Sequence, residues 1–481
     1  MMKLPRIGIL LILWVGLPLG AQGASGRPSG RAPNFVVFFC DNLGYGDIGP
    51  YGSTLHRTPH LDRLAKESRK LTHFYTAANV CTPSRVGLMT ATYPRRLNLY
   101  KNLRDGPVLQ PGESIGLNPS EVTIAEVLKT AGYRTMLIGK WHLGDQPAFL
   151  PMRQGFDEYW GVPYSDDMTP REGQNWPPLP LMRGDKVIEA PVDRNELTQR
   201  ETTEAIRFIK ENRARPFLLI ISHAMPGSTR APFASAAFRG KSRNGPYGDS
   251  VEELDWSAGK VLGALREAGL DENTLVIWTA DNSAPRRDPP QGSNAPLSGY
   301  MHSPAEGGMR VPCLVRWPGR VPAGTVGEEL ASMMDLLPTF AFLAGATPPA
   351  SDIIDGRNIW PLLAGEKNAR TPHEAFYYYQ FEQLQAVRSG PWKLFLPLER
   401  QRLGSSGPLK EVNLPARLYN VVTDQAEAQN VAAGNPDVVA RLMKLAERGR
   451  TEIGDVDFPG RGDRPAGWVF QPQMPTMSSQ R

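Results

Sequence analysis

The stretch Asn34-Phe35-Val36-Val37-Phe38-Phe39-Cys40 is an unbroken apolar run, and the polar pair Asp41-Asn42 follows it directly. A strand that is apolar throughout is typical of a parallel sheet with both faces buried. Four comparable runs occur later in the chain, at Arg134–Gly139, Phe217–Ser222, Thr274–Ala280 and Val311–Trp317. We therefore predict an α/β fold in which a large, mixed, mostly parallel sheet is sandwiched by helices.

Helical patterns separate these apolar runs. Thr58-Pro59 combines an N-cap residue with proline at the first helical position, so a helix is expected to begin there. Thr123 and Glu126 have the spacing of a capping box, before a helix that is expected to end at Gly132. Apolar residues at helical spacing between positions 250 and 270 predict a third and longer helix.

The pattern changes after Asp355. Short strand-like segments joined by turns occur at 376–379, 384–388, 392–396 and 417–421, and a helix is expected at 436–448. These segments predict a smaller C-terminal antiparallel sheet with one helix. We expect a catalytic domain at 32–355, an α+β subdomain at 356–456 and an irregular tail, rich in Pro, Gly, Arg and Gln, at 457–481.

The N-terminus has the layout of a secretory signal peptide. Lys3 and Arg6 precede the apolar run Ile7–Leu19, and Ala21-Gln22-Gly23 provides small residues suited to cleavage. The apolar run is short for a transmembrane helix, so a signal peptide at 1–23 is preferred over an uncleaved anchor. No later stretch is long and apolar enough to cross a bilayer. We expect an exported protein, periplasmic or secreted, without stable membrane insertion.

The composition is that of an ordinary globular enzyme. The chain has 481 residues, of which 41% are hydrophobic and 21% charged, and its formal net charge of +5 gives no sign of a nucleic-acid partner. Three cysteines, at positions 40, 81 and 313, are too few for a disulfide-stabilised scaffold. Cys40 and Cys313 lie in apolar runs and are expected in the core, whereas the neighbours of Cys81 are polar and turn-forming.

Polar side chains follow four of the predicted strands. They are Asp41-Asn42, Lys140-Trp141-His142, His223 and Asp281-Asn282. In open α/β sheets, ligands bind beyond the carboxyl ends of the strands, so these groups are expected to meet at one edge. An Asp or Asn after a strand is commonly a turn former, but two Asp-Asn pairs at equivalent places favour a ligand set. Their oxygen atoms suit Ca²⁺ or Mg²⁺ rather than Zn²⁺.

A series of motifs extends in a fixed order over nearly the whole chain. They are Pro33-Asn34-Phe35 through Asp47, Thr58–Leu64, Cys81-Thr82-Pro83-Ser84-Arg85, Gly139–Gly144, Asp281-Asn282, Glu306–Pro312, Leu418-Tyr419-Asn420 and Asn430-Val431-Ala432. In this order the motifs resemble the type I sulfatases, the formylglycine-dependent, arylsulfatase-like enzymes of the alkaline phosphatase superfamily. The Cys-x-Pro-x-Arg run is the most specific of them.

The resemblance implies a distinctive nucleophile. A separate maturation enzyme would oxidise Cys81 to formylglycine, whose hydrated aldehyde attacks sulfur and carries the sulfate until its release. Arg85, Lys140 and His142 would contact the hydrated aldehyde or the sulfate. The metal ligands would be Asp41, Asn42, Asp281 and Asn282 together with the modified Cys81, and the metal would be Ca²⁺, with Mg²⁺ as the alternative. The substrate would be a sulfated small molecule or glycan.

Two departures from the family pattern fall on the metal site and the acid–base machinery. Asn42 stands where the family usually has a second aspartate, which keeps an oxygen ligand but removes one charge. Gly227 occupies the place of a catalytic histidine. This leaves His223 and Arg230 as candidate substitutes, in catalysis and in substrate binding.

A third departure removes a cation from the expected sulfate site. Met301 stands where the family has a sulfate-binding lysine, with His302 beside it as a substitute when protonated. Losing one cation beside a developing anion costs about 2–4 kcal/mol in barrier height. Sulfate ester hydrolysis is the leading hypothesis. The alternatives are a phosphonate or phosphodiester hydrolase of the same fold and a non-catalytic binder of sulfated glycans.

Overall fold

The computed structural model describes residues 26–28, 30–288, 290–348, 353–402 and 407–477. The predicted signal peptide at 1–23 lies outside these described residues. Within them, no helix has both the length and the apolar character needed to cross a membrane.

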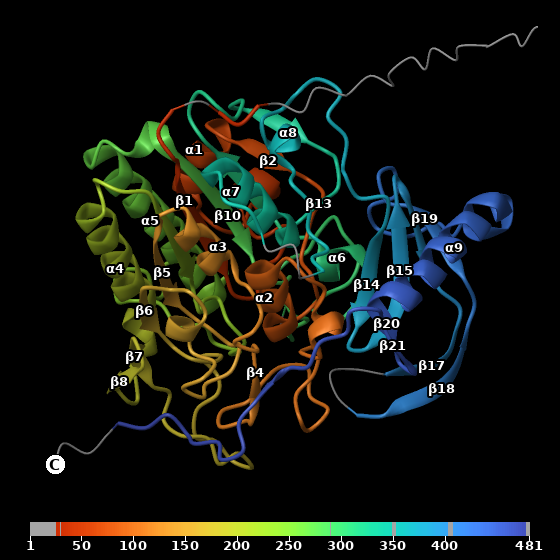
Figure 1. Ribbon diagram of the computed structural model, residues 1–481, viewed down its shortest axis with the longest axis horizontal. Helices are drawn as coiled ribbons and strands as arrows, with labels where there is room; N and C mark the ends of the chain where they lie inside the picture. Colours follow the sequence, from red (N-terminus) through yellow and green to blue (C-terminus); the bar gives the residue numbers. More distant parts are fainter. Residues whose placement is uncertain (1–25, 29, 289, 349–352, 403–406, 478–481) are drawn as a thin grey trace, which may run out of the picture.

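A ten-stranded sheet forms the centre of the larger part of the molecule (Figure 1). The strand order is β12-β2-β11-β10-β1-β9-β5-β6-β7-β8. Its five central strands are parallel: β10 (Thr274–Ala280), β1 (Asn34–Cys40), β9 (Phe217–Ser222), β5 (Arg134–Gly139) and β6 (Glu158–Gly161). Four of the predicted apolar runs are therefore confirmed as neighbouring parallel strands. Because they are parallel, their carboxyl ends lie at one edge of the sheet.

The fifth apolar run forms β11 (Cys313–Arg316), which is antiparallel to β10. A continuous apolar run indicates that a strand is buried on both faces. Helices that cover the sheet bury parallel and antiparallel strands alike, so the run does not reveal the direction of the strand. The edge strands β2 (Arg69–Leu71) and β12 (Thr325–Gly327) lie beyond β11, and a hairpin of β7 (Leu181–Arg183) and β8 (Lys186–Glu189) closes the other edge. The sheet is thus mixed and mostly parallel, as predicted.

Helices cover both faces of the sheet (Figure 1). The helices α1 (Pro59–Lys66), α4 (Leu197–Glu211) and α5 (Gly245–Glu267) pack together on one face, and α2 (Cys81–Thr90), α3 (Ile124–Thr130) and α7 (Leu336–Ala344) pack together on the other. The predicted capping box is present, because the Thr123 hydroxyl accepts a hydrogen bond from the Glu126 backbone N–H and the Glu126 carboxylate accepts one from the Thr123 backbone N–H.

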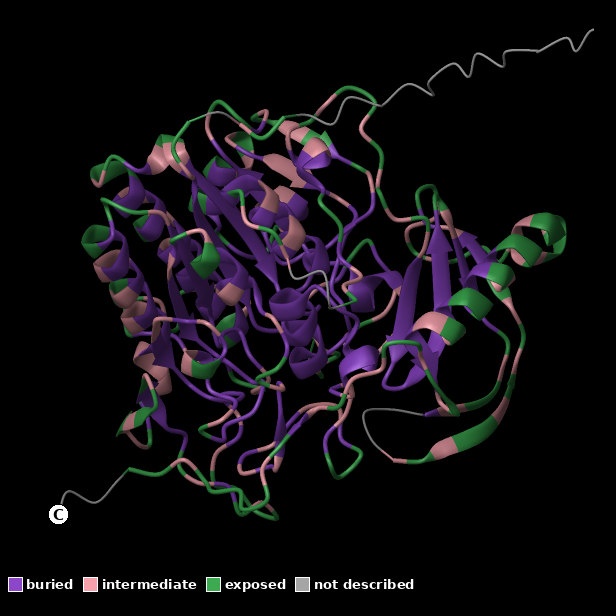
Figure 2. Ribbon diagram, viewed as in Figure 1, coloured by how far each residue is buried: buried purple, intermediate pink, exposed green. Residues whose placement is uncertain are grey.

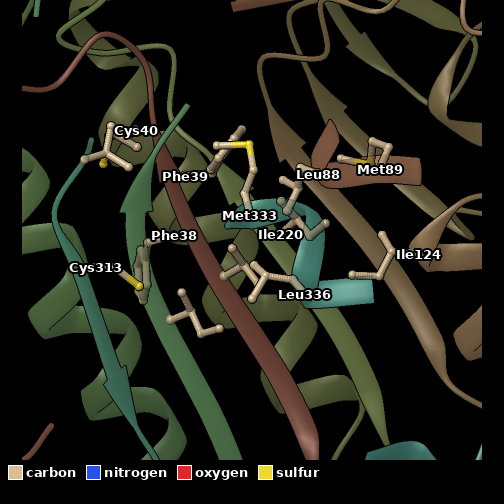
Figure 3. Packing of buried hydrophobic residues seen from close by; sticks show 14 of the residues in the cluster. Phe38, Phe39, Cys40, Leu88, Met89, Ile124, Ile220, Cys313, Met333 and Leu336 are labelled. Carbon is tan, nitrogen blue, oxygen red and sulfur yellow. The ribbon is translucent and has the colours of Figure 1, made fainter. Parts of the chain in front are cut away.

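The core lies between the sheet and these helices. Figure 3 shows side chains from α2 (Leu88, Met89) and from the start of α7 (Leu336) close to residues of the central strands, such as Phe39. The five central strands are buried almost throughout, whereas the edge strand β8 alternates between exposed and half-buried residues (Figure 2). Cys40 and Cys313 are buried free thiols in this core, as expected.

A smaller antiparallel sheet follows, with strand order β14-β15-β16-β19, and α9 (Pro436–Ile453) packs against it (Figure 1). Its strands are β14 (Phe376–Gln380), β15 (Gln383–Ser389), β16 (Trp392–Phe395) and β19 (Arg417–Asn420). The prediction of a C-terminal antiparallel sheet plus one helix is confirmed. The short elements elsewhere are β3 (Phe74–Tyr75), β4 (Ile115–Gly116), α6 (Glu306–Met309), β13 (Ala331–Ser332), α8 (Trp360–Leu363), β17 (Leu398–Arg402), β18 (Leu409–Leu414), β20 (Gly454–Asp455), β21 (Phe458–Pro459) and β22 (Gly467–Trp468).

The described part of the tail returns to the larger sheet's side of the molecule (Figure 1). Its strand β22 pairs with β4, and the Arg464 guanidinium donates to the Glu121 carboxylate at 2.8 Å. Between 457 and 477 only β21 and β22 are regular structure, and these contacts hold this segment against the N-terminal part.

Candidate active site

Cys81 is the first residue of α2, which begins beside the carboxyl end of the parallel strands. Its Sγ lies 3.3 Å from Asp41 Oδ1 and 3.6 Å from Asn42 Oδ1, both from the segment after β1. Val80 before it is extended, so the helix starts abruptly and presents the side chain of Cys81 at its N-terminal end. The free backbone N–H groups and the positive dipole end of a helix favour an anion at this place.

Oxygen atoms from two strand ends converge beside Cys81. Single ligand atoms of Asp41, Cys81 and Asp281 lie within 4.8 Å of one another. Asn42 Oδ1 accepts a hydrogen bond from Asn282 Nδ2 at 2.5 Å, and Asn282 Oδ1 is buried with no partner among the described residues. An orphaned amide oxygen beside two buried carboxylates matches the all-oxygen ligand set that Ca²⁺ or Mg²⁺ prefers. The residues present therefore fit a hard divalent cation.

Two cations balance the carboxylates. Arg85, one helical turn after Cys81, donates from Nη2 to Asp281 Oδ2 at 2.7 Å, and Lys140 Nζ lies 2.7 Å from Asp41 Oδ1. Burial alone would raise the pKa of Asp41, but Lys140 and Arg85 outweigh it and hold this pKa at about 2. Burial and the neighbouring Asp41 carboxylate raise the pKa of Asp281. The four side chains form one compact, fully buried charge cluster.

The thiol of Cys81 is not activated in this environment. Burial, and then the negative charge of Asp41, raise its pKa well above the ordinary value of a thiol. A protonated thiol is a poor nucleophile. The unmodified thiol of Cys81 is therefore poorly suited to act as a nucleophile here.

His142 contributes a basic nitrogen. Its Nε2 lies 3.0 Å from the backbone oxygen of Leu109, and a carbonyl only accepts, so Nε2 carries the proton. Burial, together with Lys140 and Arg85, lowers the pKa of His142 well below its ordinary value, so the ring is neutral. Nδ1 is left with a free lone pair and has no partner among the described residues.

The sequence did not indicate Ser165. Lys140 Nζ also donates to Ser165 Oγ, at 3.3 Å, which places this hydroxyl beside the charge cluster. Ser165 lies four residues after β6, a parallel strand like the others. Polar groups at the site follow parallel strands, so Ser165 could be predicted only if the four-residue run Glu158–Gly161 were recognised as a strand.

The structure does not bring His223 into the cluster. Its Nδ1 lies 2.6 Å from Glu201 Oε2 and its Nε2 3.1 Å from Ser257 Oγ, so α4 and α5 occupy both ring nitrogens. Arg230 is exposed in the segment that follows. Burial lowers the pKa of His302 to about 4, so this side chain carries no charge near neutral pH and does not replace the charge of a lysine.

The departing positions 227 and 301 border the cluster. Met301 Sδ lies 3.2 Å from Asn282 Nδ2. The Gly227 backbone N–H donates to the Asp41 carbonyl at 3.1 Å, and the next residue, Ser228, accepts from Asn42 Nδ2 at 2.9 Å. Both substitutions therefore change the immediate surroundings of the expected metal and sulfate.

Comparisons with known proteins identify one family. Residues 33–346 match the sulfatase family model, and residues 371–458 match the model for the C-terminal region of aryl-sulfatase. Residues 300–393 match that for the C-terminal part of N-sulphoglucosamine sulphohydrolase. The chain is 39% identical to mouse (Mus musculus) steryl-sulfatase, over 82% of this chain and 76% of that one. It is also 39% identical to human (Homo sapiens) N-acetylgalactosamine-6-sulfatase, over 77% and 72% respectively.

Solved structures of sulfatases have the same fold. The PsFucS1 sulfatase from Pseudoalteromonas sp. superimposes with a TM-score of 0.77 at 26% identity, covering 89% of this chain and 92% of that chain. A structure of Ps i-CgsB in complex with k-i-k-neocarrahexaose has a TM-score of 0.73 at 27% identity, covering 93% and 95%. The fold and the site define a hydrolase of the sulfuric ester class. The chain belongs to the sulfatase family.

Proposed function

We propose that this protein hydrolyses sulfate esters to the alcohol and sulfate through a nucleophile made from Cys81. The observation that carries the proposal is the placement of Cys81 at the start of α2, with Sγ 3.3 Å from Asp41 and 3.6 Å from Asn42. Formylglycine formed at this position would supply the hydroxyl nucleophile of a hydrated aldehyde, which the protonated thiol cannot supply. Its formation requires a maturation enzyme as a partner.

The residues of this chain have distinct roles in the proposal. Lys140 and the N-terminus of α2 bind the sulfate oxygens, and Arg85 holds Asp281 and the backbone of residue 140 in place. His142 accepts a hydroxyl proton at its free Nδ1. These groups are buried, so the hydrogen bonds act in a low dielectric.

We propose a divalent cation, Ca²⁺ first and Mg²⁺ second, at Asp41, Asn42, Asp281 and Asn282. When bound, it would neutralise the charge of the sulfate oxygens. The oxygen-only ligand set and the unpartnered Asn282 Oδ1 support this assignment.

The substrate class is a sulfated small molecule or glycan, in keeping with relatives that act on a steryl sulfate or on N-acetylgalactosamine 6-sulfate. We also propose that the protein is exported, on the basis of the signal-peptide pattern at 1–23; N-terminal sequencing of the mature protein tests this.

The replacements at positions 42, 227 and 301 favour a second candidate, a binder of sulfated glycans without turnover. Co-expression with the maturation enzyme, followed by mass spectrometry of the peptide that contains Cys81, tests the nucleophile. Hydrolysis of 4-nitrophenyl sulfate, measured beside the matching phosphonate ester, tests the reaction. The Cys81→Ala variant is the control. Turnover that survives in this variant contradicts the proposal, and so does an unmodified Cys81 thiol in active protein. Binding of sulfated polysaccharide without turnover favours the second candidate.

A further inference from the structure

The backbone at Gly227 leaves no room for a side chain, because a neighbouring carboxyl group takes the space. A Cβ at this position would lie 2.5 Å from Asp166 Oδ1 and 2.7 Å from the Ala224 carbonyl oxygen. In the resemblance described above, position 227 is the place of a catalytic histidine. In this protein the Asp166 carboxyl group occupies the space that the Cβ of such a histidine would need.

Asp166 is fully buried and incompletely hydrogen-bonded. Its Oδ1 lies 3.4 Å from the backbone N–H of Ser228, and its Oδ2 is buried with no partner in the part of the chain that the structure describes. A buried carboxyl oxygen without a partner is costly unless a ligand or a proton completes it. Oδ2 of Asp166 is therefore available to hold a proton or to bind a ligand.

Two serine residues lie between Asp166 and the charge cluster: Ser165, its neighbour in the chain, and Ser228, whose backbone N–H it contacts. Ser165 accepts a hydrogen bond from Lys140 Nζ at 3.3 Å, and Ser228 accepts one from Asn42 Nδ2 at 2.9 Å. The two serine hydroxyls are 3.5 Å apart. Asp166 therefore lies one residue from a direct neighbour of the proposed sulfate-binding lysine.

The charges around Asp166 allow it to hold a proton near neutral pH. Burial, followed by the carboxylates of Asp167 and Asp41, raises its pKa to about 7, against the opposing effect of Lys140 and Arg194. Arg287 faces the same turn, because its Nη2 donates to the Gly227 carbonyl at 2.7 Å. A pKa near the working pH suits a group that gives up and regains a proton in each turnover.

We propose that Asp166 is the general acid of the reaction, in place of the histidine that Gly227 has replaced. As the nucleophile oxygen forms its bond to sulfur and the bond between sulfur and the ester oxygen breaks, the proton on Oδ2 moves to the ester oxygen, which leaves as the neutral alcohol. The nucleophile loses two hydroxyl protons per turnover: one restores the Asp166 carboxyl group, and the other passes through His142 to solvent. One ester and one water thus give the alcohol, sulfate and one proton. This inference rests on the proposed function, since it assigns a further residue to the same reaction.

The test is the dependence of rate on the leaving group. Protonation matters most for a poor leaving group, so Asp166→Asn should lower kcat/KM for an alkyl sulfate by about 10²-fold or more and for 4-nitrophenyl sulfate by less than about 5-fold. A series of phenyl sulfates of rising leaving-group pKa should show a steeper decline in the variant than in the wild type. The basic limb of the wild-type pH profile should disappear in Asp166→Asn.

Asp167→Asn is the matched control, because it removes the neighbouring carboxylate, which lies 3.7 Å from Arg171, and keeps the Asp166 carboxyl group. Asp167 contributes to the raised pKa of Asp166, so this variant should move the basic limb of the pH profile to lower pH. Below that limb it should leave the leaving-group dependence unchanged. Asp166→Glu keeps the carboxyl group and should keep the shallow dependence, which also carries the test if Asp166→Asn does not fold. An equal loss for all leaving groups in Asp166→Asn, or a steep dependence in Asp166→Glu, overturns the assignment while wild-type turnover leaves the proposed function intact. Wild-type protein that carries formylglycine and hydrolyses no sulfate ester overturns both.

Discussion

Lys140 Nζ lies 2.7 Å from Asp41 Oδ1, and both side chains are completely buried. Lys140→Met should leave Asp41 with Arg85 as its nearest cation, at 3.6 Å. Removing one partner of a buried ion pair costs about 3–5 kcal/mol of unfolding free energy. Lys140 is the proposed sulfate-binding cation, so its loss should also lower kcat by about 10²–10³-fold.

Urea unfolding and hydrolysis of 4-nitrophenyl sulfate measure the two effects of Lys140→Met. Lys129→Met is the control, because Lys129 forms a half-exposed pair with Asp157 at 3.0 Å and should contribute less than about 1 kcal/mol. Equal stability losses in the two variants would contradict the importance of burial at Lys140.

Asn42→Asp should tighten the binding of Ca²⁺. The substitution restores a carboxylate ligand, and Asp tolerates the left-handed backbone of this residue, where φ is 59°. Without metal, the added charge beside Asp41 should lower the melting temperature, because like charges repel in a buried site. Thermal melting with and without Ca²⁺ measures both effects. A variant with the same Ca²⁺-dependent shift as the wild type would count against residue 42 as a ligand.

Met301→Lys should increase turnover. Its Sδ lies 3.2 Å from Asn282 Nδ2, so a lysine here can place an ammonium group beside the charge cluster. An added cation at a developing anion is expected to raise kcat/KM by about 10-fold or more. Met301→Leu keeps the apolar character and should leave kcat/KM near the wild-type value. A gain in Met301→Leu equal to that in Met301→Lys would refute the electrostatic explanation.

The sequence predicts the parallel core and most of the cluster because both produce local signals. The runs that form β1, β5, β9 and β10 are buried on both faces, and their polar residues follow at once. The direction of β11 has no such signal, because it depends on where the chain returns after the long segment beyond β10.

The remaining parts of the site depend on partners that are distant in the sequence. His223 follows β9 just as Asp41 follows β1, yet its ring contacts Glu201 and Ser257 on two helices. Burial decides the charge state of His302, and no neighbour in the sequence reveals that burial. The contact between Gly227 and Asp166 requires two loops to meet, so only the three-dimensional structure contains it.

Gly227→Ala should destabilise the fold more than an ordinary substitution of glycine. The φ of Gly227 is 72°, and an added Cβ would lie 2.5 Å from Asp166 Oδ1. Gly240→Ala is the matched control, because φ is 73° there and a Cβ would meet nothing within 4 Å. We expect a loss of about 1 kcal/mol at position 240 from backbone strain, and about 1–3 kcal/mol more at position 227 from the clash. Urea unfolding measures both, and equal losses would mean that the carboxyl group moves aside freely.

His373 should make the stability of the protein fall as pH rises. Burial lowers its pKa, but the Asp335 carboxylate, 2.7 Å from Nε2, outweighs burial and raises the pKa above 6.5. The folded state then binds this proton more tightly than the unfolded state, so the stabilisation is complete below the unfolded pKa and is lost as pH rises through the folded pKa. Each unit of difference between the two pKa values contributes about 1.4 kcal/mol. Urea unfolding of His373→Gln and wild type at a series of pH values from about 6 to about 8 isolates this effect, because the other titrating groups are common to both proteins. The stability difference between them should shrink as pH increases, and a constant difference would show that the pair does not titrate in this range.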